Sequence, residues 1–161
     1  MIIRNAVLED MDQIMEVYRL AKEYMVASGN PNQWINGYPA RETIEKDINR
    51  QQFYVCEENG QIHGAFMFFI GEEPTYQVIV DGSWKNEELY GTIHRLGSDG
   101  KYKGIFQGCL AFCREKHANL RADTHQDNKT MQHLLEKHGF ERCGIVYMKD
   151  GSMRIAYQLT D

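Results

Sequence analysis

Hydrophobic and polar positions repeat with two different periods along the chain, and the changes of period divide it into short elements. The apolar segment 1–7 is rich in β-branched residues and predicts an opening strand. Apolar residues then recur at the spacing of a helical face, which predicts an amphipathic helix that ends at Gly29. Asp10 and Gln13 have the spacing of a capping box at the start of this helix. A second short helix is predicted over residues 41–50.

The middle of the chain predicts strands. Residues 53–56 and 62–70 are apolar runs on either side of an Asn-Gly step at residues 59–60, and this step is typical of a tight hairpin turn. Within the polar connection that follows, residues 76–80 are expected to form a short strand. Residues 90–96 predict a central strand because they are rich in apolar and β-branched side chains.

Strands and helices alternate in the rest of the chain. A glycine-bearing loop over residues 97–104 begins a helix, and a strand over residues 120–124 precedes a helix over residues 128–138. Residues 140–148 and 153–159 predict a final hairpin. The predicted order is β-α-α-β-β-β-α-β-α-β-β, which we interpret as an α/β fold with a mixed central β-sheet and helices on both faces.

Length and charge restrict the partners. A chain of 161 residues predicts a single domain over residues 1–161. Lysine and arginine total 18 against 23 aspartates and glutamates, a formal net charge of −5, so we expect no nucleic-acid partner. The longest apolar run, residues 65–70, is far shorter than the roughly 18–20 residues of a membrane helix. No apolar leader precedes Glu9, and we therefore expect a cytoplasmic protein with no membrane partner.

The four cysteines lie in apolar stretches. The uneven spacing of Cys56, Cys109, Cys113 and Cys143 does not suit a disulfide framework and indicates reduced thiols in the core. Cys109, Cys113 and His117 recur on one face of a predicted helix, as metal ligands can. They are spread over about 12 Å, however, at about 1.5 Å per residue, which is too far for a single ion. We expect no metal.

The glycine-bearing loop over residues 97–104 is the first segment whose residues suggest a binding site. Backbone amides at the start of a helix bind anions, and phosphate is their natural ligand. Tyr102 follows Gly100 and Lys101 where a nucleotide P-loop has Ser or Thr, and no G-x-G-x-x-G motif occurs. An ordinary tight turn between a strand and a helix explains the same residues about as well.

Element order and two sequence blocks together resemble the GNAT N-acetyltransferase family. The family pattern Q/R-x-x-G-x-G/A corresponds to residues 101–106, which read Lys-Tyr-Lys-Gly-Ile-Phe. The family block N-x-x-A-x-x-L-Y-x-K-x-G-F is similar to residues 128–140. Because the element order matches from Ile2 to Leu159, the resemblance covers nearly the whole chain.

The chain departs from the family pattern at three positions. Lys101 stands where Arg or Gln is usual, which keeps a donor but loses the planar fork. Phe106 stands where a Gly or Ala lets the backbone approach the phosphates. Leu135 occupies the place of a tyrosine that often protonates the departing thiolate, so another group or water would do so here.

The resemblance implies an N-acetyltransferase that uses acetyl-CoA as cosubstrate and acetylates a primary amine of a small molecule or peptide by direct attack in a ternary complex. The alternative is a catalytically silent module of the same fold that binds acyl-CoA. Exposed sheet edges would allow a homodimer. In this resemblance the loop amides hold the pyrophosphate, and the strand end and the asparagine hold the pantetheine. The corresponding residues are Leu96, Ser98, Lys101, Tyr102, Lys103, Gly104, Ile105, Phe106 and Asn128.

Two histidines are candidates for the general base of this chemistry. His94 lies just before the glycine-bearing loop, and imidazole titrates near neutral pH without help. A half-buried strand histidine bonded to a neighbour is the alternative. His125 ends the strand that lies beside the cofactor in the family, and its alternative is a loop histidine. Asp123 and Asp127 would then only cap a helix.

Trp34 and Tyr38 lie in the loop between the first two helices. In the GNAT family this loop helps to build the acceptor pocket. We therefore expect the two aromatic side chains either to clamp a substrate or to anchor the loop on the core.

Overall fold

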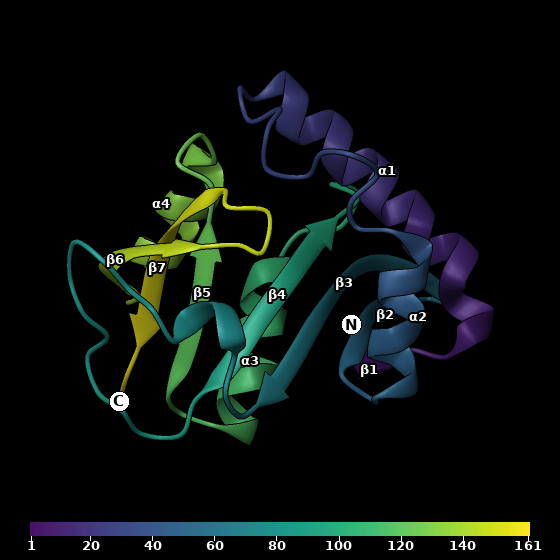
Figure 1. Ribbon diagram of the computed structural model, residues 1–161. Helices are drawn as coiled ribbons and strands as arrows, with labels where there is room; N and C mark the ends of the chain where they lie inside the picture. Colours follow the sequence, from purple (N-terminus) through teal and green to yellow (C-terminus); the bar gives the residue numbers. More distant parts are fainter.

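A seven-stranded mixed sheet forms the centre of the computed structural model, which describes residues 1–161 (Figure 1). Its strands are β1 (Ile2–Asn5), β2 (Phe53–Glu58), β3 (Gln61–Ile70), β4 (Gly91–Ser98), β5 (Leu120–Thr124), β6 (Glu141–Tyr147) and β7 (Met153–Leu159). Their spatial order is β1-β2-β3-β4-β5-β7-β6. Neighbours pair antiparallel except β4 and β5, which run parallel.

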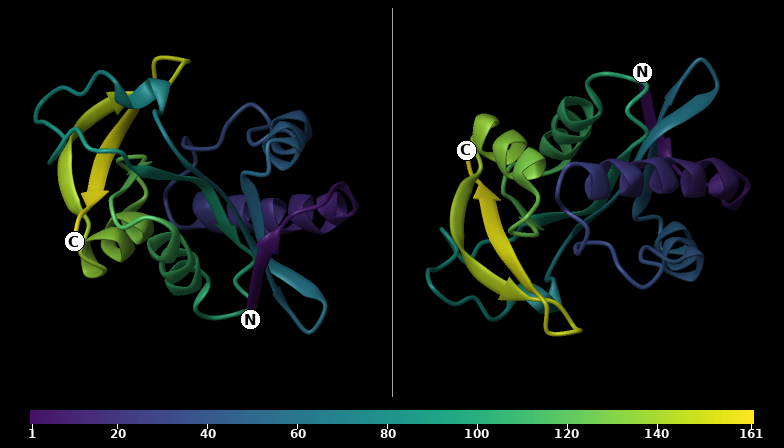
Figure 2. Two further views of the ribbon diagram at one scale, coloured as in Figure 1. Left: turned by 90° about the horizontal axis from the view of Figure 1, so that it is seen from below. Right: turned by 90° about the horizontal axis from the view of Figure 1, so that it is seen from above.

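Helices cover both faces of this sheet. They are α1 (Met11–Ala27), α2 (Arg41–Asn49), α3 (Ile105–Lys116) and α4 (Lys129–Lys137), with short 3-10 helices η1 (Leu8–Asp10) and η2 (Pro74–Tyr76). α1 and α2 pack against β2 and β3 on one face, and α3 and α4 pack on the other face (Figure 2). The predicted α/β architecture is thus confirmed. None of the helices combines the length and the apolar character that crossing a membrane requires.

Features that depend on local sequence alone, such as tight turns and helix ends, were predicted correctly. Asn59 and Gly60 have φ angles of 51° and 80°, the conformation that a tight hairpin turn requires. Gly29 ends α1 with a φ of 90°, and Gly139 follows α4 with a φ of 95°. All four cysteines are buried and free, as expected.

The prediction of a short strand at residues 76–80 is wrong. Residues 74–76 form η2 instead, and Val80 makes a single antiparallel bridge with Ile145. Pro74 at the start of this segment favours a turn over a strand, and Glu73 accepts a bond from the amide of Thr75 at 3.3 Å.

The capping box predicted at Asp10 and Gln13 is also wrong. The Asp10 carboxylate accepts from the backbone amide of Val7 at 2.9 Å and pairs with Arg4 at 2.8 Å. Gln13 Oε1 accepts from the amide of Ile62 at 3.1 Å. Both side chains therefore join α1 to the sheet instead of closing its first turn.

β4 and β5 pair over only two positions before they separate. Gly91 lies opposite Leu120, and Thr92 lies opposite Arg121. A Cβ at Gly91 would lie 2.6 Å from the Phe68 ring and 3.1 Å from Leu120, so this close approach requires glycine. Beyond these pairs the two strands diverge (Figure 1).

A bulge interrupts β4 where the strands diverge. Ala65 of β3 pairs with Gly97 and Met67 pairs with His94, so two residues of β4 oppose one residue of β3. One of the two, Arg95, has a φ of 55°. The hydroxyl of the buried Tyr18 on α1 donates to the Arg95 carbonyl at 2.6 Å and fixes the bulge.

We expect Tyr18→Phe to lower the free energy of unfolding by about 1–3 kcal/mol, because it leaves the Arg95 carbonyl without its buried donor. Tyr24→Phe is the control, since the Tyr24 hydroxyl contacts Thr130 at 3.0 Å on an exposed surface and its loss costs less than about 0.5 kcal/mol. Urea unfolding of the two variants measures both values. Equal stabilities of the two variants would contradict this role of Tyr18.

Candidate functional site

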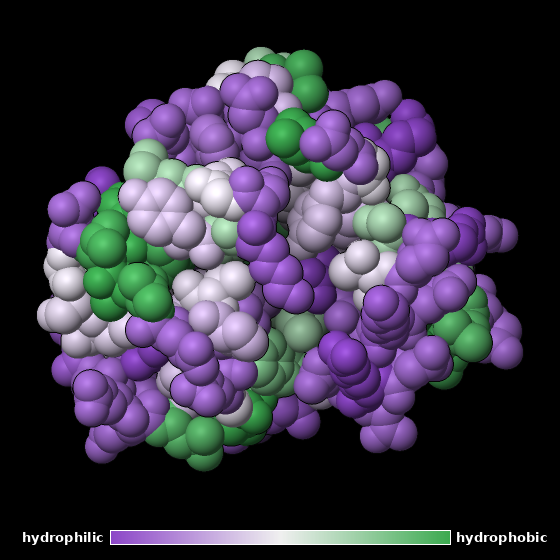
Figure 3. Space-filling view, in the orientation of Figure 1, coloured by the Kyte–Doolittle hydropathy of each residue, from purple (hydrophilic) through white to green (hydrophobic).

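A cavity of about 850 Å³ opens where β4 and β5 diverge. On one side it is lined by apolar residues of α3 and α4, among them Cys109, Leu110 and Leu135. On the other side it reaches the loop between α1 and α2 and the segment around η2. In the space-filling view strongly polar side chains cross the centre of this face, next to paler residues of intermediate hydropathy and a few apolar ones (Figure 3). The cavity therefore passes between the strands and has an apolar and a polar part.

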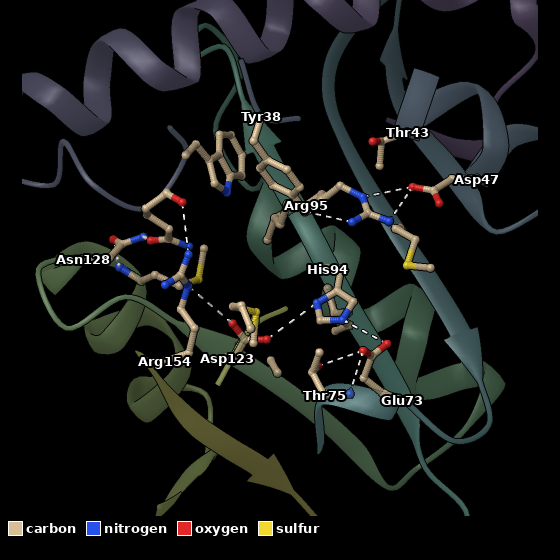
Figure 4. A pocket seen from close by; sticks show the side chains of 18 of the residues that line it. Tyr38, Thr43, Asp47, Glu73, Thr75, His94, Arg95, Asp123, Asn128 and Arg154 are labelled. Atoms are coloured by element: carbon tan, nitrogen blue, oxygen red, sulfur yellow. Dashed lines mark hydrogen bonds and ion pairs between the residues drawn. The ribbon is translucent and has the colours of Figure 1, made fainter. Parts of the chain in front are cut away.

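His94 of β4 lies in the polar part between two carboxylates (Figure 4). Its Nε2 atom lies 3.4 Å from Glu73 Oε2, and its Nδ1 atom lies 3.6 Å from Asp123 Oδ2. The Tyr76 ring meets the imidazole edge-on, with centroids 5.7 Å apart. His94 thus has a carboxylate near each ring nitrogen and the Tyr76 ring beside it.

Glu73 is ionised although it is largely enclosed. Burial alone would raise the pKa of this carboxyl, but His94 and two hydrogen bonds from Thr75 outweigh burial and lower the pKa to about 2. The Thr75 hydroxyl donates to Glu73 Oε1 at 2.8 Å. The backbone amide of Glu73 donates to the hydroxyl of the buried Tyr90 at 2.8 Å, which fixes the segment on the sheet.

Asp123 on β5 is the second carboxylate beside His94. Its Oδ2 atom accepts from the Tyr76 hydroxyl at 2.6 Å, and Arg154 of β7 lies 3.9 Å from its Oδ1 atom. Burial and the nearby Asp123 both raise the pKa of Tyr76 well above its usual value, so its hydroxyl remains a donor. The interpretation of Asp123 as a helix-capping carboxylate is wrong, because its oxygens face His94, Tyr76 and Arg154.

A second charged group lies across the cavity from Glu73 (Figure 4). The Arg95 guanidinium contacts Asp47 of α2 through Nε at 2.9 Å and through Nη2 at 2.7 Å. Its Nη1 atom donates to the Tyr38 hydroxyl at 2.8 Å. Burial raises the pKa of the Asp47 carboxyl, and Arg95 opposes that effect. This side of the site therefore contains a fixed, enclosed ion pair.

Trp34 and Tyr38 line the cavity, and Trp34 also packs on the core. The Trp34 ring meets the buried Tyr18 edge-on at a centroid distance of 5.3 Å and lies 6.5 Å from the Tyr38 ring. A Cβ at Gly97 would lie 2.8 Å from the Tyr18 ring, so β4 passes close beneath this aromatic group. The two expectations for the loop, substrate wall and core anchor, are therefore compatible.

Free backbone amides lie at the start of α3. Those of residues 102–107 donate to no other group of the protein. Gly104 precedes the helix with a φ of 90°, and nothing lies within 4 Å of a Cβ placed there. Lys101 and Lys103 on this loop are exposed. The combination of free amides, a helix N-terminus and two cations suits an anionic ligand.

The end of β4 and the loop are held by short-range bonds. Ser98 Oγ accepts from the amide of Gly100 at 3.2 Å, and Asp99 accepts from the amide of Lys101 at 2.8 Å. The second oxygen of Asp99 lies 2.8 Å from His63 Nδ1. The His63 ring stacks on Tyr102 at a centroid distance of 5.7 Å.

Apart from His125, the predicted site residues fall into two groups in the structure. Those that line the cavity are Trp34, Tyr38, His94, Leu96, Phe106 and Asn128. Those on the strand end, the loop and the start of α3 are Ser98, Lys101, Tyr102, Lys103, Gly104 and Ile105. The Phe106 ring packs against His138 at 5.0 Å, and Ile105 is buried against β3.

His125 and Asn128 lie beyond the end of β5, around Gln33. Gln33 Oε1 accepts from Asn128 Nδ2 at 2.9 Å and from the His125 amide at 3.4 Å. Asn128 Oδ1 accepts from the amide of Met131 and caps α4. His125 is not among the residues that line the cavity, and burial lowers the pKa of its imidazole. Of the two candidate histidines, only His94 faces the cavity.

Sequence reasoning missed Glu73, Asp47, Arg95 and Gln33. Glu73 lies in a polar connection without a motif, and Asp47 and Gln33 reach the site only through tertiary folding. Arg95 follows His94 in a strand, where side chains of adjacent residues normally face opposite sides. The bulge at this position turns both side chains toward the cavity, and no sequence pattern predicts this bulge.

The chain is similar in its overall fold to several solved structures. A GNAT-family acetyltransferase from Streptococcus agalactiae 2603 is similar to the chain with a TM-score of 0.89 and 34% identity, over 99% of this chain and 95% of that one. A Staphylococcus aureus Mu50 structure has a TM-score of 0.71 and 28% identity over 99% of both chains. The NatB acetyltransferase complex bound to CoA and MES has a TM-score of 0.66 and 15% identity over 100% of both chains. No family model and no curated protein matches the chain.

The charge on Glu73 gives a pH prediction. A carboxyl whose pKa falls from 4.5 to about 2 on folding stabilises the protein above pH 4.5, and this contribution is lost as the pH falls toward 2. Wild type should therefore lose roughly 2–3 kcal/mol relative to Glu73→Gln between about pH 6 and pH 2, most of it below about pH 4.5. Urea unfolding across this range measures the difference.

The matched control is Glu72→Gln, which removes an exposed carboxylate that makes no hydrogen bond or ion pair. Its stability should follow that of wild type at each pH. A difference between wild type and Glu73→Gln that stays constant with pH would contradict the ionised, paired state of Glu73.

Proposed function

This chain belongs to the GNAT family and is an acetyltransferase, and we propose that it transfers the acetyl group of acetyl-CoA to a primary amine by direct attack in a ternary complex. The observation that supports this most is His94, held between Glu73 and Asp123 in a cavity that passes between β4 and β5. A base at this place can serve an acceptor on the polar side and a thioester on the apolar side.

The residues around α3 fit acetyl-CoA. The free amides of residues 102–107 and the exposed Lys101 and Lys103 suit a pyrophosphate, since donors and positive charge meet at one helix N-terminus. The apolar part of the cavity, which includes Leu96 and Phe106, suits the pantetheine arm. Beyond Thr92 the edge of β4 that faces β5 has no strand partner, so its backbone groups are available to the arm.

The acceptor side lies between the aromatic loop and the charged groups. Acetyl-CoA supplies a thioester at which the amine nitrogen forms the new C–N bond while the C–S bond breaks and sulfur keeps the electron pair. His94 accepts the proton that the amine loses, at Nε2. Glu73 beside Nε2 and Asp123 beside Nδ1 stabilise the imidazolium that results.

The departing sulfur needs a proton. Leu135 of α4 stands where the family often has a tyrosine, and it is buried with 3% exposure. Its side chain has no proton to give. We therefore assign protonation of the thiolate to solvent, which is consistent with the ordinary acidity of a thiol, with a pKa of about 8.5.

The function is tested by the rate of coenzyme A release from acetyl-CoA with and without an amine. A primary amine should increase the rate to saturation and yield the acetylated product. Its N,N-dimethyl counterpart is the control, because it has no N–H to lose and yields no stable amide. The same slow release with and without every amine tested would mean hydrolysis alone and would overturn the proposal.

We expect His94→Gln to lower kcat by roughly 10²–10⁴-fold and to leave the Kd for acetyl-CoA unchanged, because the variant removes the base and keeps the cofactor surface. His133→Gln, an exposed histidine on α4, is the control and should retain full activity. Turnover equal to wild type in His94→Gln would exclude His94 as the base.

Gly104→Pro should weaken acetyl-CoA binding by about tenfold or more, because proline removes one free amide and cannot adopt the φ of 90°. Gly60→Pro imposes the same strain in the turn between β2 and β3, at a φ of 80°, and should leave the affinity unchanged. Calorimetric titration with acetyl-CoA gives both values. Unchanged affinity in Gly104→Pro would remove the loop from the binding site.

A further inference from the structure

Arg95 adopts a backbone conformation that is unusual for a residue with a side chain. Its φ of 55° lies in the left-handed region, although it is not glycine and lies inside β4. Two independent contacts maintain it: the Tyr18 hydroxyl on its carbonyl at 2.6 Å and Asp47 on its guanidinium. Strain that the surroundings maintain in this way points to a function of the side chain that it positions.

The bulge places Arg95 and His94 in the same cavity. In a regular strand these consecutive side chains would face opposite sides of the sheet. Because the register of β4 shifts between His94 and Gly97, both side chains line the cavity and lie next to one another (Figure 4). The consequence of the strained residue is thus a fixed cation beside the proposed base.

The guanidinium retains donors for a ligand. It has five N–H groups, and three are engaged by Asp47 and Tyr38 through Nε, Nη2 and Nη1. Asp47 and Arg95 have side-chain exposures of only 4% and 13%. The cost of removing both charges from water offsets most of their attraction, so an ion pair enclosed to this degree adds little net stability. In some proteins such a pair serves instead to fix one geometry.

Apart from Glu72, Lys149 and Asp150, the charged residues that line the cavity fall into two clusters, one around Arg95 and one around His94. Around Arg95 are one carboxylate, Asp47, and a second guanidinium, Arg50, which lies near enough to lower the pKa of Asp47. This side has one surplus positive charge. Around His94 are the carboxylates of Glu73 and Asp123 and the guanidinium of Arg154, which lies 3.9 Å from Asp123. With His94 neutral, this cluster has one surplus negative charge.

The geometry points to an acceptor that is a zwitterion: we propose that Arg95 binds a carboxylate of the acceptor while its amine lies at His94. The substrate class is an amino acid or a molecule with the same two groups. A monoanionic carboxylate matches the single surplus charge and the two remaining N–H donors of Arg95. This inference rests on the proposed function and narrows its acceptor.

The test compares acceptors that differ only in the carboxylate. α-, β- and γ-amino acids are each paired with their amides, and a diamine of similar length is added. Wild type should acetylate at least one amino acid with a kcat/KM about tenfold or more above that of its amide. The amine of the amide is less basic, so a larger fraction of it is in the reactive neutral form. This difference favours the amide, and a preference for the amino acid therefore cannot result from it.

Arg95→Gln should remove this preference, mainly through a higher KM for the amino acid, so that the ratio of kcat/KM for the amino acid to kcat/KM for its amide falls toward one. Because the variant leaves Asp47 buried without a partner, the double variant Arg95→Gln/Asp47→Asn removes both charges and retains a neutral pair. Arg41→Gln, an arginine exposed on α2, is the control and should keep the preference.

The outcomes separate this inference from the proposed function. Amides or diamines acetylated as well as the amino acids by wild type would overturn the zwitterion and leave the proposed function intact. A preference for the carboxylate that persists in both Arg95 variants would overturn the role of Arg95. Acetylation of no amine would overturn the proposed function and this inference with it.

Discussion

The parallel pairing of β4 with β5 ends after Thr92 and Arg121. Each strand remains paired on its other side, β4 with β3 and β5 with β7. The separation therefore opens the sheet without unfolding it, at the cost of strand edges whose backbone groups lack a partner. A ligand that runs between the strands can satisfy those groups, and the cavity lies at this place.

Charge compensation determines what the cavity can do. His94 projects from β4 into the opening, and each ring nitrogen has a carboxylate beside it. The carboxylates are fixed in turn by Thr75 and Tyr76, so the segment around η2 belongs to the site although it is far from the glycine-bearing loop in sequence. Since burial favours neutral groups, the ionised state of Glu73 depends on His94 and on Thr75.

Local signals predicted the elements well and the site only in part. The Asn-Gly turn, the helix-ending glycines and the two periods of hydrophobic residues are local properties, and they gave the element order correctly. The position of His94 before the loop also followed from order alone. Glu73, Asp47 and Gln33 reach the site through contacts between distant segments, and Arg95 reaches it through a bulge. None of these leaves a pattern in the sequence, because each depends on the registers and packing of other elements.

The central claim is that the divergence of β4 and β5 forms one site with the cofactor on the α3 side and the base between the strands. A crystal structure of the protein with acetyl-CoA tests it most directly. The account predicts the pyrophosphate on the amides of residues 102–107 and the thioester in the opening beside His94. A pyrophosphate bound elsewhere, or a thioester that does not reach the opening between the strands, would contradict it.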